Sequence, residues 1–231
     1  MKPSSQEVII VLGPPGSGKG TQAELLADKL GLFHLETSKI IDAELEGVKK
    51  SDFVKVGGKK YPLFKEKKAR EKGELMSPPL ISFWLENKTK ELKKSGKGII
   101  FSGSPRTLAE TKELVPLLKK LYSQKDIKVI SLTLKPVDSI WRNSHRKTCQ
   151  LFRHPILFNN ETKKITKCPF DGSKLFFRKD DTPKVIKIRL KEYKERTLPV
   201  MDYFKKEKIK VIKINGAPPP ALVFQNILRS L

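Results

Sequence analysis

Apolar residues follow two patterns along the chain, and the two patterns alternate. Compact runs rich in β-branched residues, which are typical of strands buried on both faces, occupy Glu7–Leu12, Phe33–Leu35, Lys97–Phe101, Lys128–Leu134 and Lys208–Ile214. Apolar residues at helical spacing predict helices at Thr21–Leu30, Pro79–Lys94, Leu108–Tyr122, Asp138–Arg146 and Lys184–Phe204. Such alternation indicates a three-layer α/β fold, in which a parallel sheet carries helices on both faces.

Two stretches interrupt this alternation. Thr37–Ser77 is polar and mostly helical in pattern, and Cys149–Phe177 contains Pro, Asn and Gly turn signals. We interpret both as insertions over the sheet, so that the core comprises residues 1–36, 78–148 and 178–231. Lysine-rich pieces such as Lys65–Lys72 are short enough to be solvated helix faces.

Charge is the most unusual feature of the composition. The 231 residues include 48 Lys plus Arg against 25 Asp plus Glu, a formal net charge of +23. Such a surface attracts polyanions. A nucleic-acid partner and a small phosphorylated ligand on a generally basic surface both fit, and charge does not choose between them.

The early apolar run Val8–Leu12 is too short to export the chain or to span a membrane, and no other segment is long enough to do so. We therefore expect a cytoplasmic protein that does not enter a membrane. In that compartment Cys149 and Cys168 stay reduced and are open to metal.

A glycine-rich segment follows the first predicted strand and opens the first predicted helix. It reads Gly13-Pro-Pro-Gly-Ser-Gly-Lys-Gly-Thr21, in which Lys19 follows Gly18. Backbone N–H groups in such a loop surround phosphate oxygens, the helix N-terminus adds positive potential, and the lysine reaches the β and γ phosphates. A plain strand-to-helix turn is the alternative, and the context favours a phosphate loop (P-loop).

The position after Lys19 is Gly20, and the hydroxyl comes one residue later at Thr21, whereas most ATPases and GTPases carry Ser or Thr directly after the lysine. GPPGSGKGTQ, residues 13–22, resembles the phosphate loop of adenylate kinases and related nucleoside monophosphate kinases. Further matches in the family order are Phe101–Thr107 (resembling D-G-F-P-R-T), the pair Arg142 and Arg146, Arg178–Asp181, Ile188–Leu190 with Glu192-Tyr193, and Asn215–Pro218.

The resemblance implies an enzyme that transfers the γ-phosphoryl group of MgATP to a nucleoside monophosphate, with AMP as the expected acceptor. It implies an ATP site at Gly13, Gly16, Ser17, Gly18, Lys19, Gly20, Thr21, Arg142 and Gly216, and catalytic roles for Lys19, Arg106, Arg142, Arg146, Arg178 and Arg189. Arginine suits this work because its planar fork of donors holds phosphate bidentately. For any single arginine, a surface salt bridge is the alternative.

The resemblance also implies an acceptor site at Thr37, Leu75, Met76, Gly103, Arg106 and Glu110. In the family, the acids corresponding to Asp180 and Asp181 tie the mobile lid to the arginines and to the nucleotide ribose. Asp181 could also be the N-cap of the helix that starts near Lys184.

Three residues depart from the family pattern. Asp42 stands where the family has an arginine that grips the AMP phosphate, Ser102 replaces an Asp that organises Mg²⁺ through water, and Glu110 replaces a Gln that pairs with adenine. Lys39 replaces an acid three residues before Asp42, so this pair of charges is a candidate for an exchange.

These departures keep two other functions open. One is a degenerate kinase that binds ATP without phosphorylating AMP, and the other is a basic P-loop protein acting on RNA. No RNA-binding motif with interleaved aromatic residues supports the second.

The second insertion resembles the zinc-bearing lid of long-form members of the family. The usual second ligand would fall at Phe152, which cannot bind a metal, but His154 can complete a set with Cys149, Cys168 and Asp171. Tetrahedral Zn²⁺ takes such N, S and O ligands, so a structural zinc ion is possible. Members of the family are monomers, and we expect the same here.

Overall fold

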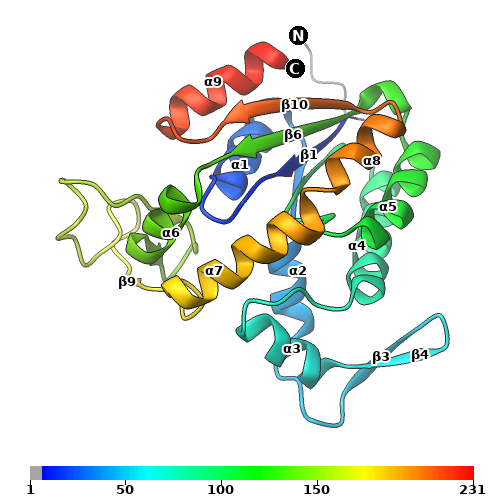
Figure 1. The fold of residues 1–231 in the computed structure, drawn as a ribbon, viewed down its shortest axis with the longest axis horizontal. Coiled ribbons are helices and arrows are strands. Elements are labelled where there is room, and N and C mark those ends of the chain that lie inside the picture. Colours follow the sequence, from blue (N-terminus) through cyan, green and yellow to red (C-terminus); the bar gives the residue numbers. More distant parts are fainter. Residues whose placement is uncertain (1–6) are drawn as a thin grey trace.

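A five-stranded parallel sheet forms the centre of the computed structural model, which describes residues 7–231 (Figure 1). Its order is β10-β6-β1-β5-β2. The bounds are β1 Val8–Leu12, β2 Phe33–Glu36, β5 Ile99–Ser102, β6 Ile127–Thr133 and β10 Lys210–Asn215. The five predicted strands are thus confirmed to within about two residues at most ends. The first six residues of the predicted core segment lie outside the described residues.

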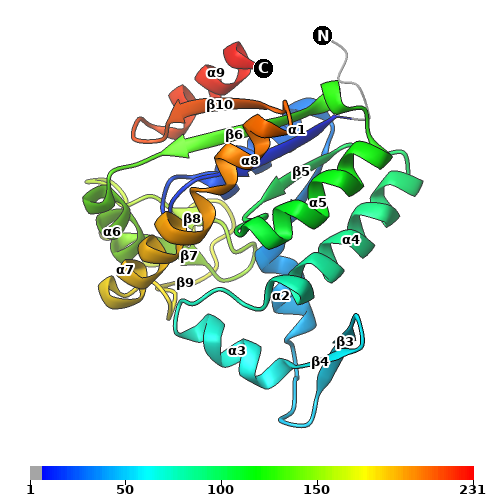
Figure 2. The same ribbon diagram turned by 45° about the vertical axis from the view of Figure 1, so that its right-hand side comes forward.

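Helices cover both faces of the sheet, as predicted. Alternate residues of β1 point to opposite faces: Ile9 and Val11 pack in one apolar cluster, and Val8, Ile10 and Leu12 in another. The first cluster is covered by α1 Lys19–Leu30 and α9 Pro220–Ser230, and the second by α4 Pro78–Lys94, α5 Leu108–Leu121 and α8 Val200–Lys206. Figures 1 and 2 show these two layers on either side of the sheet.

The first insertion is less helical than predicted. It holds α2 Thr37–Glu44, the antiparallel strands β3 Phe53–Val56 and β4 Lys59–Pro62, and α3 Leu63–Glu71. Gly57 and Gly58 both have positive φ, at 56° and 79°, which a two-residue hairpin turn of the mirror-image type requires. The Gly-Gly pair between two short runs was therefore an available hairpin signal. The hairpin projects from the body of the protein (Figures 1 and 2), not over the sheet.

The second insertion is built on a small antiparallel sheet of order β8-β7-β9. Its strands are β7 Lys147–Cys149, β8 Pro155–Ile156 and β9 Leu175–Phe176, and α6 Pro136–His145 leads into it. Cys149, Ile156 and Cys168 form a buried cluster of their own. This cluster is too small to bury much apolar surface, so the segment depends on other cross-links.

The single long helix predicted at Lys184–Phe204 is wrong. The segment contains α7 Pro183–Glu192, a π-helical turn at Tyr193–Thr197, and α8. Pro199 has no backbone N–H to donate, which interrupts the α-helical hydrogen bonding. The N-cap of α7 is Thr182, whose hydroxyl accepts a hydrogen bond from the Val185 N–H at 3.4 Å, so Asp181 is not the cap.

A short 3₁₀ turn, η1 Gln124–Asp126, completes the regular elements between α5 and β6. Across residues 7–231 the helices all fall short of the length and apolar character needed to cross a bilayer.

Candidate active site

The glycine-rich loop lies between β1 and α1, at the carboxyl edge of the sheet. Gly18 precedes α1 in a left-handed conformation, and Lys19 is the first helical residue. A Cβ on Gly16 would come within 2.6 Å of the Asn143 side-chain nitrogen, and its φ of 73° also favours glycine. The loop therefore wraps closely on α6 and keeps its backbone N–H groups at the helix N-terminus, where anions bind.

Four cations meet at this loop: Lys19, Arg106, Arg146 and Arg189, called here the cationic cluster. The Lys19 Nζ donates a hydrogen bond to the Pro14 carbonyl at 2.8 Å. Burial, and then the positive charges of Arg106, Arg189 and Arg146, lower the pKa of Lys19 well below its usual value. Four residues from separate parts of the chain thus share one electrostatic site.

Two carboxylates orient the arginines of this cluster. Arg146 makes a two-pronged ion pair with Asp181, with N···O distances of 2.6 and 2.9 Å. Arg189 donates to Asp180 at 3.1 Å and lies 3.6 Å from Asp181. Burial lowers the pKa of Arg189 to about 10, even though both acids oppose that shift. The Asp181 side chain is only 2% exposed, so its charge is held for Arg146 and Arg189 and not for solvent.

Arg142 lies at another part of the site. Its Nη atoms donate to the carbonyls of Gly216 at 2.8 Å and Ala217 at 2.5 Å. The backbone of Gly216 in turn lies against the loop, because a Cβ there would meet the Ser17 carbonyl at 2.9 Å. An open pocket of about 540 Å³ adjoins these residues, lined by Thr133, Leu134, Lys135, Asp138, Asn215 and Ala217. It is large enough for a nucleobase.

Arg178 stands apart from the other predicted arginines. It is half-buried just before Asp180, and within residues 7–231 its side chain makes no ion pair or hydrogen bond. The structure therefore does not bring it into the cationic cluster.

Three hydrogen bonds hold Arg106 in place. Its Nε donates to the Gly103 carbonyl, its backbone N–H donates to the Glu110 carboxylate at 2.9 Å, and its carbonyl accepts from the Thr197 hydroxyl at 2.9 Å. Thr197 closes the π-helical turn, so the interruption of the predicted long helix serves to hold Arg106. Nothing in the sequence pattern signalled this contact.

Glu110 completes a capping box rather than standing free in a base pocket. Its carboxylate also accepts from the Thr107 hydroxyl at 3.1 Å, while the Thr107 oxygen accepts from the Glu110 N–H at 3.2 Å. Burial raises the pKa of Glu110 above its ordinary value. The T-x-x-E spacing was visible in the sequence, and its structural use ties Arg106 to the start of α5.

Thr37, Leu75 and Met76 were predicted on the acceptor side. Thr37 is buried at the start of α2, and among the residues that the structure describes its hydroxyl has no hydrogen-bond partner. Met76 is buried and Leu75 half-buried, and both follow α3 directly. A buried hydroxyl without a partner is costly unless a ligand supplies one.

Comparison with known proteins agrees with this geometry. The family model for adenylate kinase matches residues 11–209. The chain belongs to the adenylate kinase family. Curated adenylate kinases similar to it include that of Methanothrix thermoacetophila, 30% identical over 96% of this chain and 97% of the relative. That of Chlamydia trachomatis serovar L2 is 32% identical over 96% and 89%, and that of Mycoplasma mycoides is 35% identical over 85% and 86%.

Members of the adenylate kinase family are nucleoside monophosphate kinases that transfer phosphoryl groups between nucleotides and use ATP with Mg²⁺. The chain is therefore a nucleotide phosphotransferase. The cluster around the phosphate loop fits that chemistry, because phosphoryl transfer depends chiefly on positioning and on stabilising negative charge.

The residues that depart from the adenylate kinase pattern have partners of their own. Ser102 is buried, and its hydroxyl lies 2.7 Å from the His34 Nε2. Burial lowers the pKa of His34. In the pairing of β2 with β5, Glu36 stands directly opposite Ser102. A carboxylate is thus next to position 102, although on the neighbouring strand.

Lys39 and Asp42, the pair considered as an exchange of charges, each have another partner. Lys39 lies 3.4 Å from Glu36, and Asp42 lies 2.5 Å from the Nη1 of Arg70 on α3. Arg70 was not singled out in the sequence analysis. It belongs to the run Lys65–Lys72, whose lysines are exposed or half-buried, as predicted for a solvated face.

The insertion at 149–177 of this adenylate kinase homologue gathers the four predicted ligands. One donor atom from each of Cys149, His154, Cys168 and Asp171 lies within 4.8 Å of the others. Cys149 Sγ is 2.8 Å from Asp171 Oδ2, and His154 Nε2 is 3.1 Å from Cys168 Sγ. Distances of this size suit donors around one tetrahedral ion.

Backbone N–H groups add to this arrangement. Those of Phe152 and Phe170 point at Cys149 Sγ and Cys168 Sγ, each at 3.4 Å, and would stabilise thiolates. The exposed Phe152 takes no part as a ligand, and the chain turns so that His154 reaches the cluster.

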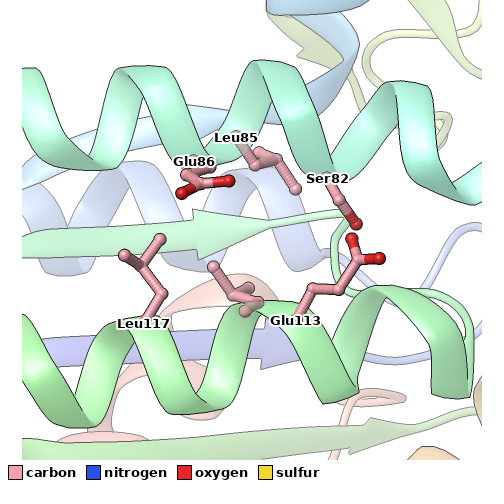
Figure 3. A pocket seen from close by; sticks show the side chains of 6 residues that line it. Ser82, Leu85, Glu86, Glu113 and Leu117 are labelled. Atoms are coloured by element: carbon pink, nitrogen blue, oxygen red, sulfur yellow. The ribbon is translucent and has the colours of Figure 1, made fainter. Parts of the chain in front are cut away.

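Another pocket lies between α4 and α5, away from the phosphate loop (Figure 3). Its volume is about 60 Å³, too small for a nucleotide. Figure 3 shows Ser82 and Glu113 pointing toward one another across it, with Leu85 and Leu117 alongside. It is a packing gap between two helices.

Proposed function

We propose that this protein transfers the γ-phosphoryl group of MgATP to AMP and releases two ADP. The observation that carries the proposal is the cationic cluster. Three carboxylates, Asp180, Asp181 and Glu110, accompany its four cations within residues 7–231, so positive charge is in excess. Bound phosphates relieve that repulsion, because the negative oxygens of two nucleotides would gather where the cations are crowded.

On the donor side, the loop at Gly13, Gly16, Ser17, Gly18, Gly20 and Thr21 would hold the ATP phosphates through backbone N–H groups. Lys19 would reach the β and γ phosphates, and Arg146 and Arg189 would stabilise the group in transfer. Arg142 and Gly216 would border the adenosine, beside the open pocket. Arg178, the first residue after the lid, would have to move toward the cluster, since within the described residues its side chain makes no ion pair or hydrogen bond with it.

On the acceptor side, Arg106 would hold the acceptor phosphate from its fixed place between Gly103 and Glu110. The unpartnered Thr37 hydroxyl and the backbone at Leu75 and Met76 would contact the base. A hydroxyl that can both donate and accept suits the mixed edge of adenine, and this supports AMP as acceptor.

The insertions give the site a means of closing. We assign residues 37–77 to acceptor binding, residues 149–177 to a lid, and residues 1–36, 78–148 and 178–231 to the core. Asp180 and Asp181, which follow the lid in the chain, pair with Arg189 of α7 and with Arg146 at the end of α6. Closure would exclude water and so suppress hydrolysis of ATP.

The lid would hold a structural zinc ion through Cys149, His154, Cys168 and Asp171. The donor set fits zinc: two sulfurs, one imidazole nitrogen and one carboxylate oxygen lie within 4.8 Å of one another. The ion would replace the missing apolar core of this segment, and phosphoryl transfer would not involve it. We expect a cytoplasmic monomer that binds nucleotides, and the net charge of +23 leaves a nucleic-acid partner open.

The test uses purified protein with MgATP and AMP, CMP, UMP or GMP in separate reactions, with diphosphate products separated by chromatography. ADP formed from AMP, and lost in Arg106→Ala, is the expected result. Binding of ATP without any product would leave a nucleotide-binding protein that has lost its acceptor reaction. Preference for another monophosphate would place the error in the base pocket around Thr37 and Glu110.

A further inference from the structure

A carboxylate stands at position 42, on α2, where the family has an arginine that grips phosphate. Left unpaired, Asp42 would repel an acceptor phosphate. Instead its Oδ1 lies 2.5 Å from the Nη1 of Arg70, 28 residues later in the chain. Arg70 comes from α3, and both views of the ribbon place α3 beside α2 (Figures 1 and 2).

The helix that carries Arg70 is anchored at the active site. Glu66, one turn earlier, is buried and accepts hydrogen bonds from the backbone N–H and hydroxyl of Ser77, at 2.8 and 2.5 Å. Gly73, just after α3, lies against the side chains of Val185 and Arg189. Contacts on both sides of Arg70 in the chain therefore hold α3 in place. Arg189 of the cationic cluster takes part in the contact at Gly73.

Arg70 also interacts electrostatically with Arg106. Burial lowers the pKa of Arg106, the Glu110 carboxylate opposes this, and the positive charge of Arg70 lowers that pKa further. The Arg70 side chain is 32% exposed, so part of its guanidinium remains available to a ligand while Asp42 holds one Nη atom. Two guanidinium groups near one another are favourable only when an anion joins them.

We propose that Arg70 binds the acceptor phosphate together with Arg106, and that Asp42 is the positioning residue that aims it. The guanidinium has moved from α2 to α3, and the former arginine position supplies its anchor. The proposal rests on the proposed function, since it concerns the acceptor of that reaction. It removes the main objection to activity, because Asp42 then no longer repels phosphate.

The plain alternative is a surface ion pair, and such pairs contribute little to stability or binding. Helix α3 offers a matched control. Lys68 lies 3.3 Å from Glu71 on the same helix, with both side chains more than half exposed. Lys68→Met removes one cation from α3, as does Arg70→Met, without touching the pair with Asp42.

The experiment measures KM for monophosphate and for ATP, kcat, and monophosphate affinity by calorimetry in the absence of ATP. Losing a charge-assisted phosphate contact raises KM and Kd about 10- to 100-fold. We expect that rise for the monophosphate in Arg70→Met, with KM for ATP within about twofold of wild type. Arg70→Lys should recover part of the affinity, and Lys68→Met should match wild type.

Two further variants separate positioning from folding. Asp42→Asn should raise the monophosphate KM less than Arg70→Met does, with an unchanged thermal unfolding midpoint. The double variant Asp42→Arg/Arg70→Met returns a guanidinium to α2 and should bind the monophosphate more tightly than Arg70→Met alone. If the double variant binds the monophosphate no more tightly than Arg70→Met, the transfer of the guanidinium from α2 to α3 is contradicted.

The result that overturns the proposal is monophosphate affinity in Arg70→Met equal to that in Lys68→Met. Calorimetry measures monophosphate binding without turnover, so this outcome can be distinguished from failure of the proposed function. A wild-type protein that binds AMP without turnover contradicts the kinase reaction, while the Arg70 comparison still stands on Kd. CMP, UMP and GMP carry the same phosphate and take the place of AMP if it does not bind. Absence of binding by all four would overturn the proposal.

Discussion

The proposed donor and acceptor sides of the site both carry positive charge, but they differ in how closely their residues follow the family pattern. The residues proposed for the donor side, Lys19 in α1 and Arg142 and Arg146 at the end of α6, match the sequence pattern of the family. Three residues depart from that pattern, at the proposed acceptor side and the expected Mg²⁺ position, and each has a partner: Asp42 with Arg70, Ser102 with His34, and Glu110 with Thr107.

The difference shows what each side requires. The phosphate loop is a backbone device, in which a change of residue alters the turn itself, as the close approach of Gly16 to Asn143 illustrates. A guanidinium that binds an exposed phosphate can come from any nearby element, because only its place in space matters. If Arg70 binds the acceptor phosphate as proposed, the acceptor side has changed in sequence and kept its charge.

The largest effect should come from the donor side. Lys19→Met removes the lysine at the loop, and kcat should fall about 10²- to 10³-fold, because a fixed charge aimed at the transferred group is lost. The fold should remain, since the change also relieves repulsion from three arginines. Steady-state assays and urea unfolding check both points. Activity within about tenfold of wild type would contradict the role of Lys19.

The ion pair between Arg146 and Asp181 should be next in size. Asp181→Asn leaves Arg146 without its two-pronged partner, and we expect a loss of about 3 kcal/mol in the free energy of unfolding, the lower end for buried pairs. Asp180→Asn, whose side chain is 41% exposed, should lose less than about 1 kcal/mol. Equal losses in urea unfolding would show that burial of Asp181 is not the cause.

Removal of metal should affect the lid before the core. Treatment with a chelator, or Cys168→Ser, should raise the rate of limited proteolysis within residues 149–177 about tenfold or more, the change expected for about 1.4 kcal/mol of local stability. Mapping the first cleavage sites by mass spectrometry measures this. Zinc content of the untreated protein is the accompanying control, and an unchanged cleavage pattern would argue against a metal-dependent lid.

The smallest effect concerns the acceptor side and depends on pH. Since burial raises the pKa of Glu110, the folded state holds its proton more tightly than the unfolded state does. The stability that this provides is complete below the ordinary pKa and is lost as the pH rises through the raised one. Gln does not titrate, so the stability of Glu110→Gln relative to wild type should increase from pH 4 to pH 7.

Urea unfolding at the two pH values tests this, with the exposed Glu113→Gln on the same helix as the control. A relative stability that falls with rising pH would show that the hydrogen bonds from Arg106 and Thr107 outweigh burial.

Much of the fold followed from local pattern. The alternation of apolar runs and helical spacing predicted the sheet and most of its helices, because buried parallel strands have few polar positions. The two errors came from local signals that compete with periodicity. Gly57-Gly58 made a hairpin inside a polar segment that looked helical, and Pro199 ended hydrogen bonding inside a segment with a continuous helical face.

Most of the candidate site also followed from sequence, but its internal contacts did not. The glycine spacing and the order of the arginines identified the donor side and the family before any coordinates. The hydrogen bond from Thr197 to Arg106 joins residues 91 positions apart, and the pair Asp42–Arg70 joins residues 28 positions apart. Such contacts carry no signal in a single sequence.

Residue types along the chain predict the layered α/β fold, the phosphate loop and four candidate metal-binding residues, because apolar runs, glycine spacing and donor types are visible in one sequence. Which charges meet depends on the folded structure. From the sequence alone, Asp42 is expected to repel phosphate. In the structure it lies 2.5 Å from Arg70, whose charge acts on Arg106. Electrostatic energy depends on distance in space, and the fold sets that distance.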